Sequence, residues 1–333
     1  MIGEDDLVRR IRAATAADTD GVIVGIGDDC AVLATTPGTQ LIVTTDLLVE
    51  DVHFRRRYAE PADIGWKALA VNVSDIAAKG ARSRWAVVAL ACPAATIPDE
   101  IDAFYEGMLS LGGELGVAIV GGDTSSSPVS WFVNITLVGE ATRGVLRSTA
   151  RPGDVVAVTG SLGRSAAGLA VLERDHAPAG IDAATLAEMT AAHLRPRPRA
   201  AEGRWLGAAD GVTAMMDLSD GLAIDLPRLC AESGVGARVR VDAVPIAPGT
   251  RRVAAALERD ALAWATGGGE DYELLVACAP DAFARLSEGL LKATGTTLTR
   301  VGDLERGGGI HFVDGGGRAV DVARGFEHFV TGR

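Results

Sequence analysis

The chain has 333 residues, of which 48% are hydrophobic and 23% charged, as expected of a folded globular protein with enough sequence for two domains. Its net charge of −12 argues against a nucleic-acid-binding protein, because that function needs a basic face. The four cysteines show no CxxC spacing and predict buried, reduced thiols in a cytoplasmic protein. The acidic, amphipathic N-terminus does not resemble a signal peptide, and no apolar run is long enough to cross a membrane.

Hydrophobic periodicity in the first half predicts strands that often follow one another without a helix between them. Prolines open two of the expected helices, as is common at a first helical turn. The expected elements in chain order are a helix over 4–16, strands over 22–26, 30–33 and 40–44, a helix from Pro61, a strand over 83–91, a helix from Pro98, and strands over 117–120 and 131–138.

The segment 142–153 loses this periodicity and ends in a Pro-Gly turn, so we expect a domain boundary there and divide the chain into 1–148 and 149–333. The adjacent strands favour an α+β fold in both halves over a doubly wound sheet. Beyond the boundary we expect strands over 155–159, 213–216, 237–241, 272–277, 297–301 and 310–313, and helices over 165–173, 183–193, 199–209, 221–232 and 280–291.

Short aspartate motifs are the most informative feature of the chain. Most follow apolar, strand-like runs, and acids at strand ends lie beside one another if the strands share a sheet. Such a cluster repels itself unless a cation fills it, and hard oxygen ligands favour Mg²⁺, which usually carries phosphate groups as well. The motifs therefore predict chemistry on a nucleotide. They are GIGDDC (25–30), TTD (44–46), NVSD (72–75), GGD (121–123), DLSDG (217–221) and GGGED (267–271).

Most of these motifs also have a simpler reading. GDD at 27–29 is a common turn sequence, and Ser219 or Asp220 could cap the helix that follows. A lone histidine such as His53 and an arginine such as Arg147 in a connecting segment are usually solvated, and the same applies to the run 55–57. Asp75 differs, because it lies between Val73 and Ile76 on an apolar helix and a buried carboxylate needs a partner.

The order of the motifs resembles that of the thiamine-monophosphate kinase family, within the wider group of purine-biosynthesis cyclo-ligase-like ATP enzymes. The resemblance extends from about residue 3 to Phe329. It rests on GIGDDCAVL, TTDLLVEDVHF, KALAVNVSDIAAKGA, GGDTSSS, VTGSLGRSAAGL, HLRPRPR, DLSDGLAIDL and GGEDYEL. It implies an ATP- and Mg²⁺-dependent transfer of phosphate to thiamine monophosphate, giving thiamine diphosphate.

The resemblance also implies two α/β domains in a homodimer, with ATP and Mg²⁺ bound mainly by residues 1–148 and the site completed by 149–333. Nucleic acid and membrane are not expected partners. The implied metal ligands, for several Mg²⁺ ions, are Asp29, Thr44, Thr45, Asp46, Asp75, Asp123, Asp217 and Asp220. The implied ATP contacts are Tyr105, Gly122, Asp123, Arg147 and Ser219. The implied contacts to thiamine monophosphate are His53, Glu270 and Phe326.

The alternatives are another ATP enzyme of the same superfamily or a catalytically silent nucleotide-binding regulator. Selenophosphate synthesis would want a reactive cysteine in the N-terminal loop, the cyclo-ligase a GTK-type motif near TTD, and the hydrogenase-maturation relative a cysteine-bearing tail; none of these is present. No P-loop, GxGxxG, GxSxG or HExxH motif and no EF-hand loop occurs either.

Overall fold

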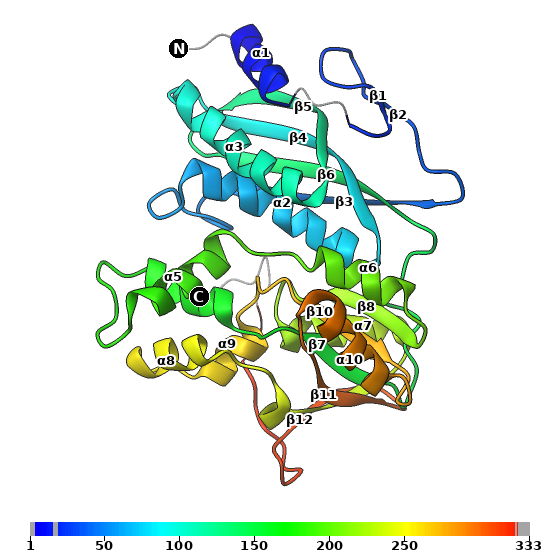
Figure 1. Ribbon diagram of the computed structural model, residues 1–333. Coiled ribbons are helices and arrows are strands. Elements are labelled where there is room, and N and C mark those ends of the chain that lie inside the picture. Colours follow the sequence, from blue (N-terminus) through cyan, green and yellow to red (C-terminus); the bar gives the residue numbers. More distant parts are fainter. Residues whose placement is uncertain (1–3, 16–18, 324, 326–333) are drawn as a thin grey trace. The chain divides into compact units, whose positions relative to one another are not determined.

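A computed structural model describes residues 4–15, 19–323 and 325, with side chains from residue 8 onward (Figure 1). The contacts between residues divide the chain into two units. Unit 1 contains the residues up to Gly144 except Ala77–Gly80, and unit 2 contains Ala77–Gly80 and the residues from Val145 onward. The described part of the chain has no helix that is both long and apolar enough to span a bilayer.

Unit 1 is built on a four-stranded sheet in which chain order is not strand order. The strands run β3-β6-β4-β5, with β4 and β5 parallel and the other neighbours antiparallel. A separate two-stranded sheet pairs β1 with β2. The strands are β1 (Val22–Val24), β2 (Val32–Leu33), β3 (Gln40–Val49), β4 (Arg82–Pro93), β5 (Ala118–Ser127) and β6 (Phe132–Ala141).

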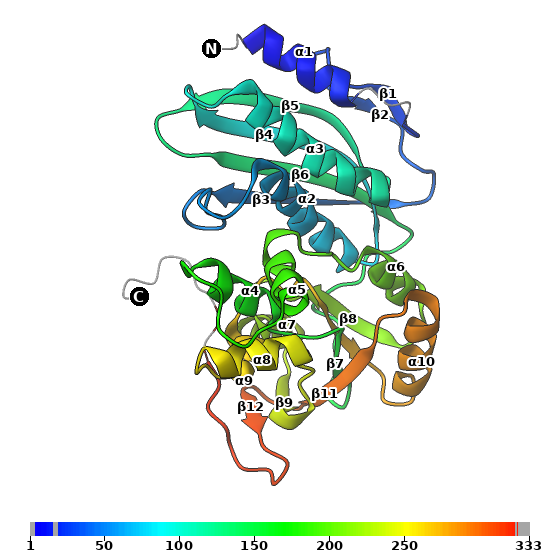
Figure 2. The same cartoon turned by 60° about the vertical axis from the view of Figure 1, so that its left-hand side comes forward.

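Two helices, α2 (Pro61–Ala77) and α3 (Pro98–Leu115), lie over one face of this sheet, and α1 (Glu4–Thr15) lies against α3 and β5 (Figures 1 and 2). Two glycines let α2 and α3 pack with their backbones in contact. A Cβ atom at Gly65 would lie 1.9 Å from the carbonyl oxygen of Phe104, and one at Gly107 would lie 1.9 Å from that of Ala62. Glycine is therefore required at this crossing.

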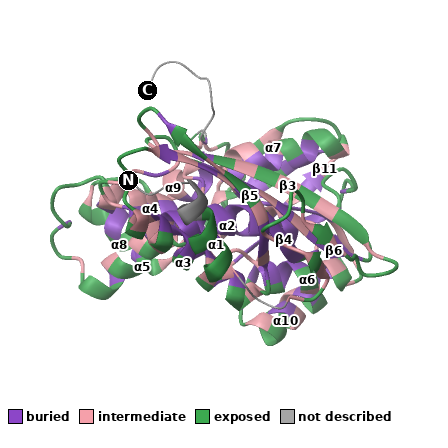
Figure 3. Ribbon diagram, turned by 90° about the horizontal axis from the view of Figure 1, so that it is seen from above, coloured by how far each residue is buried: buried purple, intermediate pink, exposed green. Residues whose placement is uncertain are grey.

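The opposite face of the same sheet is partly exposed and carries several apolar side chains. Along β3, Leu41, Val43 and Leu47 are exposed while Leu48 is buried, which follows from the two-residue repeat of a strand. The antiparallel register places Val138 of β6 beside Val43, and Val87 of β4 is exposed as well. Figure 3 shows the contrast between buried residues in α2 and exposed residues on β3. The segment around β1 and β2 covers this face at Trp85 of β4, which is buried beside Gly21, and leaves the β3 side open.

Unit 2 contains a six-stranded sheet that is covered on both faces. The strand order is β12-β9-β11-β7-β10-β8, and only β12 and β9 are parallel. All five residues of β7 and of β10 are buried, as expected of central strands that are packed on two sides. The strands are β7 (Val155–Thr159), β8 (Val212–Asp217), β9 (Gly236–Arg240), β10 (Leu274–Cys278), β11 (Leu298–Glu305) and β12 (Ile310–Val313).

Alternate residues of β7 enter different cores. Val156 and Val158 pack with α7, whereas Val155 and Ala157 pack with α6 and α10. A third small core joins α4, α5 and α8 through Ala167, Met189 and Val253. The helices of unit 2 are α4 (Arg164–Leu172), α5 (Ala183–Leu194), α6 (Ala200–Ala208), α7 (Leu222–Ser233), α8 (Pro248–Ala256), α9 (Ala261–Gly267) and α10 (Phe283–Thr294), with a 3₁₀ turn at Val241–Ala243.

The α+β fold class predicted from the sequence is confirmed, but one detail of strand geometry is wrong. TTD and GGD were expected at strand ends, and both lie inside strands, at 44–46 of β3 and 121–123 of β5. The strands expected over 30–33 and 40–44 follow each other directly in the sequence, yet β2 pairs with β1 and β3 pairs with β6. Local turn chemistry did not indicate these distant partners.

Three further expectations need correction. Helices α8 and α9 were missed, because both are short and follow an irregular segment. Cys30 is exposed, although the other three thiols are buried as expected. Arg56 was interpreted as a solvated residue, but its guanidinium pairs with Glu100 and lies 5.0 Å from the ring centre of Trp131.

We predict that Gly122→Ala destabilises unit 1 and that the neighbouring Gly121→Ala does not. A Cβ atom at Gly122 would lie 2.0 Å from the carbonyl oxygen of Val88, so β4 and β5 would have to separate, whereas a Cβ at Gly121 meets no atom within 4 Å. Overpacking of this kind costs about 1–3 kcal/mol. Urea unfolding followed by tryptophan fluorescence would measure the difference, and equal midpoints for the two variants would contradict this packing.

Candidate active site

In unit 1, Thr44, Asp46 and Asp75 form one cluster between β3 and α2. The hydroxyl of Thr44 donates a hydrogen bond to Asp75, which confirms that the half-buried Asp75 has a partner. Burial and the negative charge of Asp75 raise the pKa of Asp46 to about 6. Two carboxylates therefore lie close enough to repel each other, and this raises the free energy of the doubly ionised state.

Thr45 lies on the other face of the same strand. Its hydroxyl is 3.3 Å from Asn134 Oδ1 and accepts a hydrogen bond from Thr136 at 3.2 Å. The sheet register, through Ala89 of β4, places Asp123 on this second face as well. Successive residues of a strand point to opposite faces of the sheet. Thr45 is therefore separated from Thr44 and Asp46, with which it was expected to bind metal.

The three predicted ATP contacts of unit 1 lie together. Tyr105 of α3 and Gly122 and Asp123 of β5 line one cavity of about 50 Å³, with Val8 and Ile11 of α1 on its other side. Burial raises the pKa of Tyr105 above the usual range of a phenol, so its hydroxyl group is neutral at physiological pH. The cavity has the mixed character of a ligand site, with apolar side chains and a few polar groups.

A larger cavity of about 510 Å³ adjoins this one, since Val8, Ile26, Gly121 and Gly122 line both. The loop after β1 supplies Asp28 and Asp29 to it. Both aspartates are exposed, and Asp28 accepts a hydrogen bond from the backbone N–H of Asp29 at 2.7 Å. Residues 27–29 therefore form the expected turn and line this cavity at the same time.

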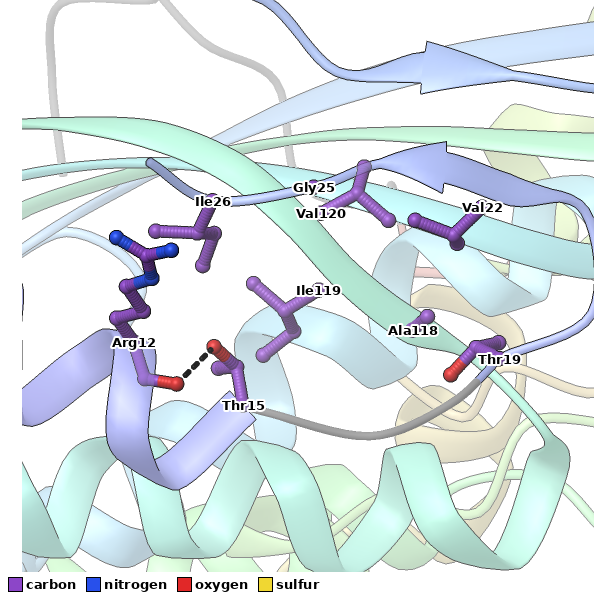
Figure 4. A pocket seen from close by; sticks show the side chains of 9 residues that line it. All are labelled: Arg12, Thr15, Thr19, Val22, Gly25, Ile26, Ala118, Ile119 and Val120. Atoms are coloured by element: carbon purple, nitrogen blue, oxygen red, sulfur yellow. Dashed lines mark hydrogen bonds between the residues drawn. The ribbon is translucent and has the colours of Figure 1, made fainter. Parts of the chain in front are cut away.

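Figure 4 shows a further cavity of about 190 Å³ that contains none of the predicted site residues. Arg12 and Thr15 of α1 lie on one side of it, and Ile119 and Val120 of β5 on another. Ile26 and Val120 also line the 510 Å³ cavity. Ile26 therefore lines all three cavities.

His53 is held in the loop after β3. Its Nδ1 accepts a hydrogen bond from the backbone N–H of Val49 at 3.0 Å, and Lys67 donates to its carbonyl oxygen at 3.0 Å. Because Nδ1 is the acceptor, Nε2 carries the proton of the neutral ring. His53 is therefore fixed in a tautomer that can donate from Nε2.

In unit 2, the DLSDG and GGGED motifs lie side by side. The backbone N–H of Glu270 donates to the carbonyl oxygen of Ser219 at 2.7 Å, and that of Tyr272 donates to Leu218 at 3.0 Å. Asp217, at the end of β8, is buried and lies opposite Leu274 of β10. The sheet thus brings together two segments that lie far apart in the sequence.

Neither Ser219 nor Asp220 caps helix α7. The carboxylate of Asp225, from the first helical turn, accepts the backbone N–H groups of Asp220 at 2.9 Å and Gly221 at 3.1 Å. Arg228 donates to both Asp220 and Asp225. Burial raises the pKa of Asp225 to about 6, against the effect of these hydrogen bonds. The predicted role of Ser219 or Asp220 as a cap is therefore wrong.

The acids of the GGGED loop have different partners. Glu270 Oε2 lies 3.2 Å from His193 Nδ1. Asp271 accepts hydrogen bonds from the backbone N–H groups of Gly163 at 2.6 Å and Ser165 at 3.2 Å, at the start of α4, while burial raises its pKa to about 7. Asp271 therefore anchors the loop, whereas the side chain of Glu270 is 26% exposed to solvent.

Two predicted positions complete the set. Arg147 is exposed, and its carbonyl oxygen accepts a hydrogen bond from Ser233 at 2.7 Å. Phe326 lies outside the described residues. Over the described part of the chain, no three His, Cys, Asp or Glu side chains come close enough to hold a metal ion. Within unit 1, Asp46 and Asp75 lie on one face of the sheet and Asp123 lies on the other, and the hypothesis that the scattered acids form one cluster stays a prediction.

Sequence analysis did not identify the residues that support the unit 2 loop. Glu273 is fully buried, and its carboxylate accepts two 2.6 Å bonds from Arg199 and one of 2.7 Å from Thr159. Such a bidentate pair fixes both partners. In the sequence, His193 and Arg199 both lie in the HLRPRPR segment. This segment carries no recognisable chemical motif that would have identified them.

Comparison with known proteins identifies the family. Two family models match, AIR synthase related protein, N-terminal domain, over residues 27–141 and AIR synthase related protein, C-terminal domain, over residues 151–315. A thiamine-monophosphate kinase of Salmonella typhimurium strain LT2 is 38% identical over 334 residues and 99% of each chain.

Solved structures agree with this. A thiamine-monophosphate kinase from Stenotrophomonas maltophilia K279a has a TM-score of 0.82 at 37% identity, covering 94% of this chain and 96% of that one. AaThiL complexed with AMPPCP and TMP has a TM-score of 0.78 at 30% identity, covering 98% and 97%. The chain therefore belongs to the thiamine-monophosphate kinase family and is built from two AIR synthase related domains.

Proposed function

We propose that the protein transfers the γ-phosphoryl group of ATP to thiamine monophosphate and so produces thiamine diphosphate. The observation that carries this proposal is the near full-length likeness to AaThiL, which was solved with AMPPCP and TMP bound. AMPPCP is an analogue of ATP, so that relative binds a nucleotide and TMP together.

The chemistry requires little from a general base. The attacking group is a phosphate oxygen that is already ionised at neutral pH, so the difficulty is the approach of two polyanions and the charge of the transition state. We infer direct in-line transfer, without a phosphorylated enzyme intermediate. This is consistent with a site that contains no obvious general base.

Magnesium ions fit the donor set of unit 1. The Asp46 carboxylate is destabilised in its ionised form by burial and by Asp75, and a bound cation would remove that penalty. We propose that Thr44, Asp46 and Asp75 hold Mg²⁺, and that Asp29, Thr45, Asp123, Asp217 and Asp220 contribute to further ions. When bound, Mg²⁺ offsets phosphate charge and so favours the approach of the two substrates.

The remaining residues are proposed to bind and orient the substrates. Tyr105 and Gly122 contact ATP in the cavity beneath α1 and Asp123 lies beside them, while Arg147 and Ser219 contact it from unit 2. His53, Glu270 and Phe326 contact thiamine monophosphate. An arginine such as Arg147 suits phosphate oxygens because its planar group can donate two hydrogen bonds.

We further propose that residues 1–148 form the ATP- and Mg²⁺-binding and dimerisation domain and that 149–333 complete the site. Cytoplasmic location is part of this proposal, because reduced thiols persist in that compartment and the four cysteines are unpaired. The rival function is a catalytically silent nucleotide-binding regulator, which would bind Mg-ATP tightly without turnover.

The decisive experiment incubates the purified protein with Mg-ATP and thiamine monophosphate and identifies the product by mass. We expect thiamine diphosphate and ADP in equal amounts, with thiamine and aminoimidazole precursors as poorer competing substrates. A parallel reaction with γ-labelled ATP and no acceptor should leave the protein unlabelled. Absence of turnover alongside tight nucleotide binding would favour the silent regulator, and a labelled protein would exclude direct transfer.

We predict that Asp46→Asn lowers kcat by about 10²-fold or more, because it removes charge from the proposed metal cluster, a loss comparable to that of other electrostatic groups in active sites. The melting temperature should stay the same or rise, since the repulsion between Asp46 and Asp75 disappears. Asp99→Asn, at an exposed position on the first turn of α3, is the matched control. Near-normal turnover in Asp46→Asn would remove this residue from the metal site.

We propose that a second copy of the chain covers the open face of the unit 1 sheet, which agrees with the homodimer implied by the resemblance. Val43 is 61% exposed on β3, the edge strand of that sheet, and burying an unpaired carboxylate is costly. Val43→Asp should therefore convert the protein to a monomer in analytical ultracentrifugation. Val129→Asp, at a 79% exposed position between β5 and β6, should leave the dimer intact; identical sedimentation of all three proteins would refute this interface.

A further inference from the structure

A buried histidine in unit 2 contacts both a serine and the glutamate of the GGGED loop. His193, in the last turn of α5, has its Nδ1 atom 3.0 Å from Ser165 Oγ and 3.2 Å from Glu270 Oε2. The His193 side chain is 4% exposed and that of Glu270 is 26% exposed. The histidine is thus inaccessible to a ligand, whereas the carboxylate that it contacts can still be reached from solvent.

The backbone holds Glu270 in an unusual conformation. Its φ of 56° lies in the left-handed region, which is unfavourable for a residue other than glycine and tends to occur at functional sites. The conformation is fixed on both sides, by the bond from Glu270 N–H to Ser219 and by the two bonds that Asp271 accepts at the start of α4. The loop therefore presents the Glu270 side chain in one direction.

The contact determines where the ring proton lies. An ionised carboxylate only accepts hydrogen bonds, so His193 Nδ1 must carry a proton if it is bonded to Glu270. The Ser165 hydroxyl oxygen is then a second acceptor at the same N–H. Both contacts use one nitrogen, and Ser165 is 1% exposed, so this cluster is not a Ser-His-Glu catalytic triad, in which serine and carboxylate bond to different ring nitrogens.

We propose that His193 is a positioning residue, which donates its Nδ1–H to Glu270 and holds that carboxylate ionised and oriented toward the cationic ring of thiamine monophosphate. This inference rests on the proposed function. A carboxylate repels the phosphate end of the acceptor and attracts the positively charged thiazolium end. His193 therefore acts on recognition of the acceptor and leaves the binding of ATP unchanged.

Two amide variants test the position of the donated proton. Asparagine can place an N–H near the position of Nδ1, whereas the longer glutamine places it near Nε2. We expect His193→Gln and His193→Ala to raise the KM for thiamine monophosphate about tenfold, as for loss of a hydrogen bond to a charged group, with the KM for ATP and kcat within about twofold. His193→Asn should restore most of the affinity for the acceptor.

Exposed His176 provides the control, since His176→Asn changes the same residue type in unit 2 away from this loop. Melting temperatures of all variants separate loss of fold from loss of binding. If His193→Ala does not fold, the comparison of His193→Asn with His193→Gln still applies. The ¹⁵N shifts of His193 in the wild-type protein give a second measurement, which should report a protonated Nδ1.

The outcomes separate this inference from the proposed function. No turnover of thiamine monophosphate by the wild-type protein overturns the function, and with it the substrate part of this inference. Normal wild-type turnover together with equal KM values for the Asn and Gln variants overturns only the role of His193. Parallel changes in both KM values, or an unprotonated Nδ1, would do the same.

Discussion

A carboxylate removed from water must be compensated by a hydrogen bond or a positive charge, and the buried acids of this protein meet that requirement in different ways. In unit 2, Arg199 binds Glu273, and backbone N–H groups bind Asp225 and Asp271. In unit 1, Asp46 and Asp75 have no such cation in the described contacts; a hydroxyl from Thr44 bonds Asp75, and the two charges face each other. This uncompensated pair is the place where we propose that Mg²⁺ binds.

This difference separates the acids that support the fold from the pair that we propose as metal ligands. The hydrogen bond and the charge of Glu273 raise the pKa of Arg199, although burial of the guanidinium opposes this, so that pair stays ionised as a fixed support. Asp46 has its pKa raised to about 6 by burial and Asp75, and only a ligand can reverse that effect. Site and support can thus be distinguished by what lies next to each carboxylate, which sequence alone does not reveal.

Much of the fold could be predicted because its signals are local. Pro61 and Pro98 mark helix starts, apolar runs mark the central strands, and the apolar neighbours of Asp75 indicated that it needs a partner. What could not be predicted depends on the face of a strand or on distant pairing. Thr44 and Thr45 are neighbours in sequence, yet one contacts Asp75 and the other contacts Thr136 across the sheet. Motif order identified the family correctly, whereas the expected single cluster of acids stays a prediction.

The GGGED loop shows how two adjacent acids acquire different roles. The left-handed conformation at Glu270 sends its side chain to His193, while Asp271 turns to the first N–H groups of α4. Burial raises the pKa of Asp271 to about 7, which is acceptable for an acid that only anchors the loop. An acid that recognises a cation has to stay charged, and a protonated nitrogen beside it favours that state. The contact with His193 is therefore consistent with a binding role for Glu270, while Asp271 keeps the loop in place.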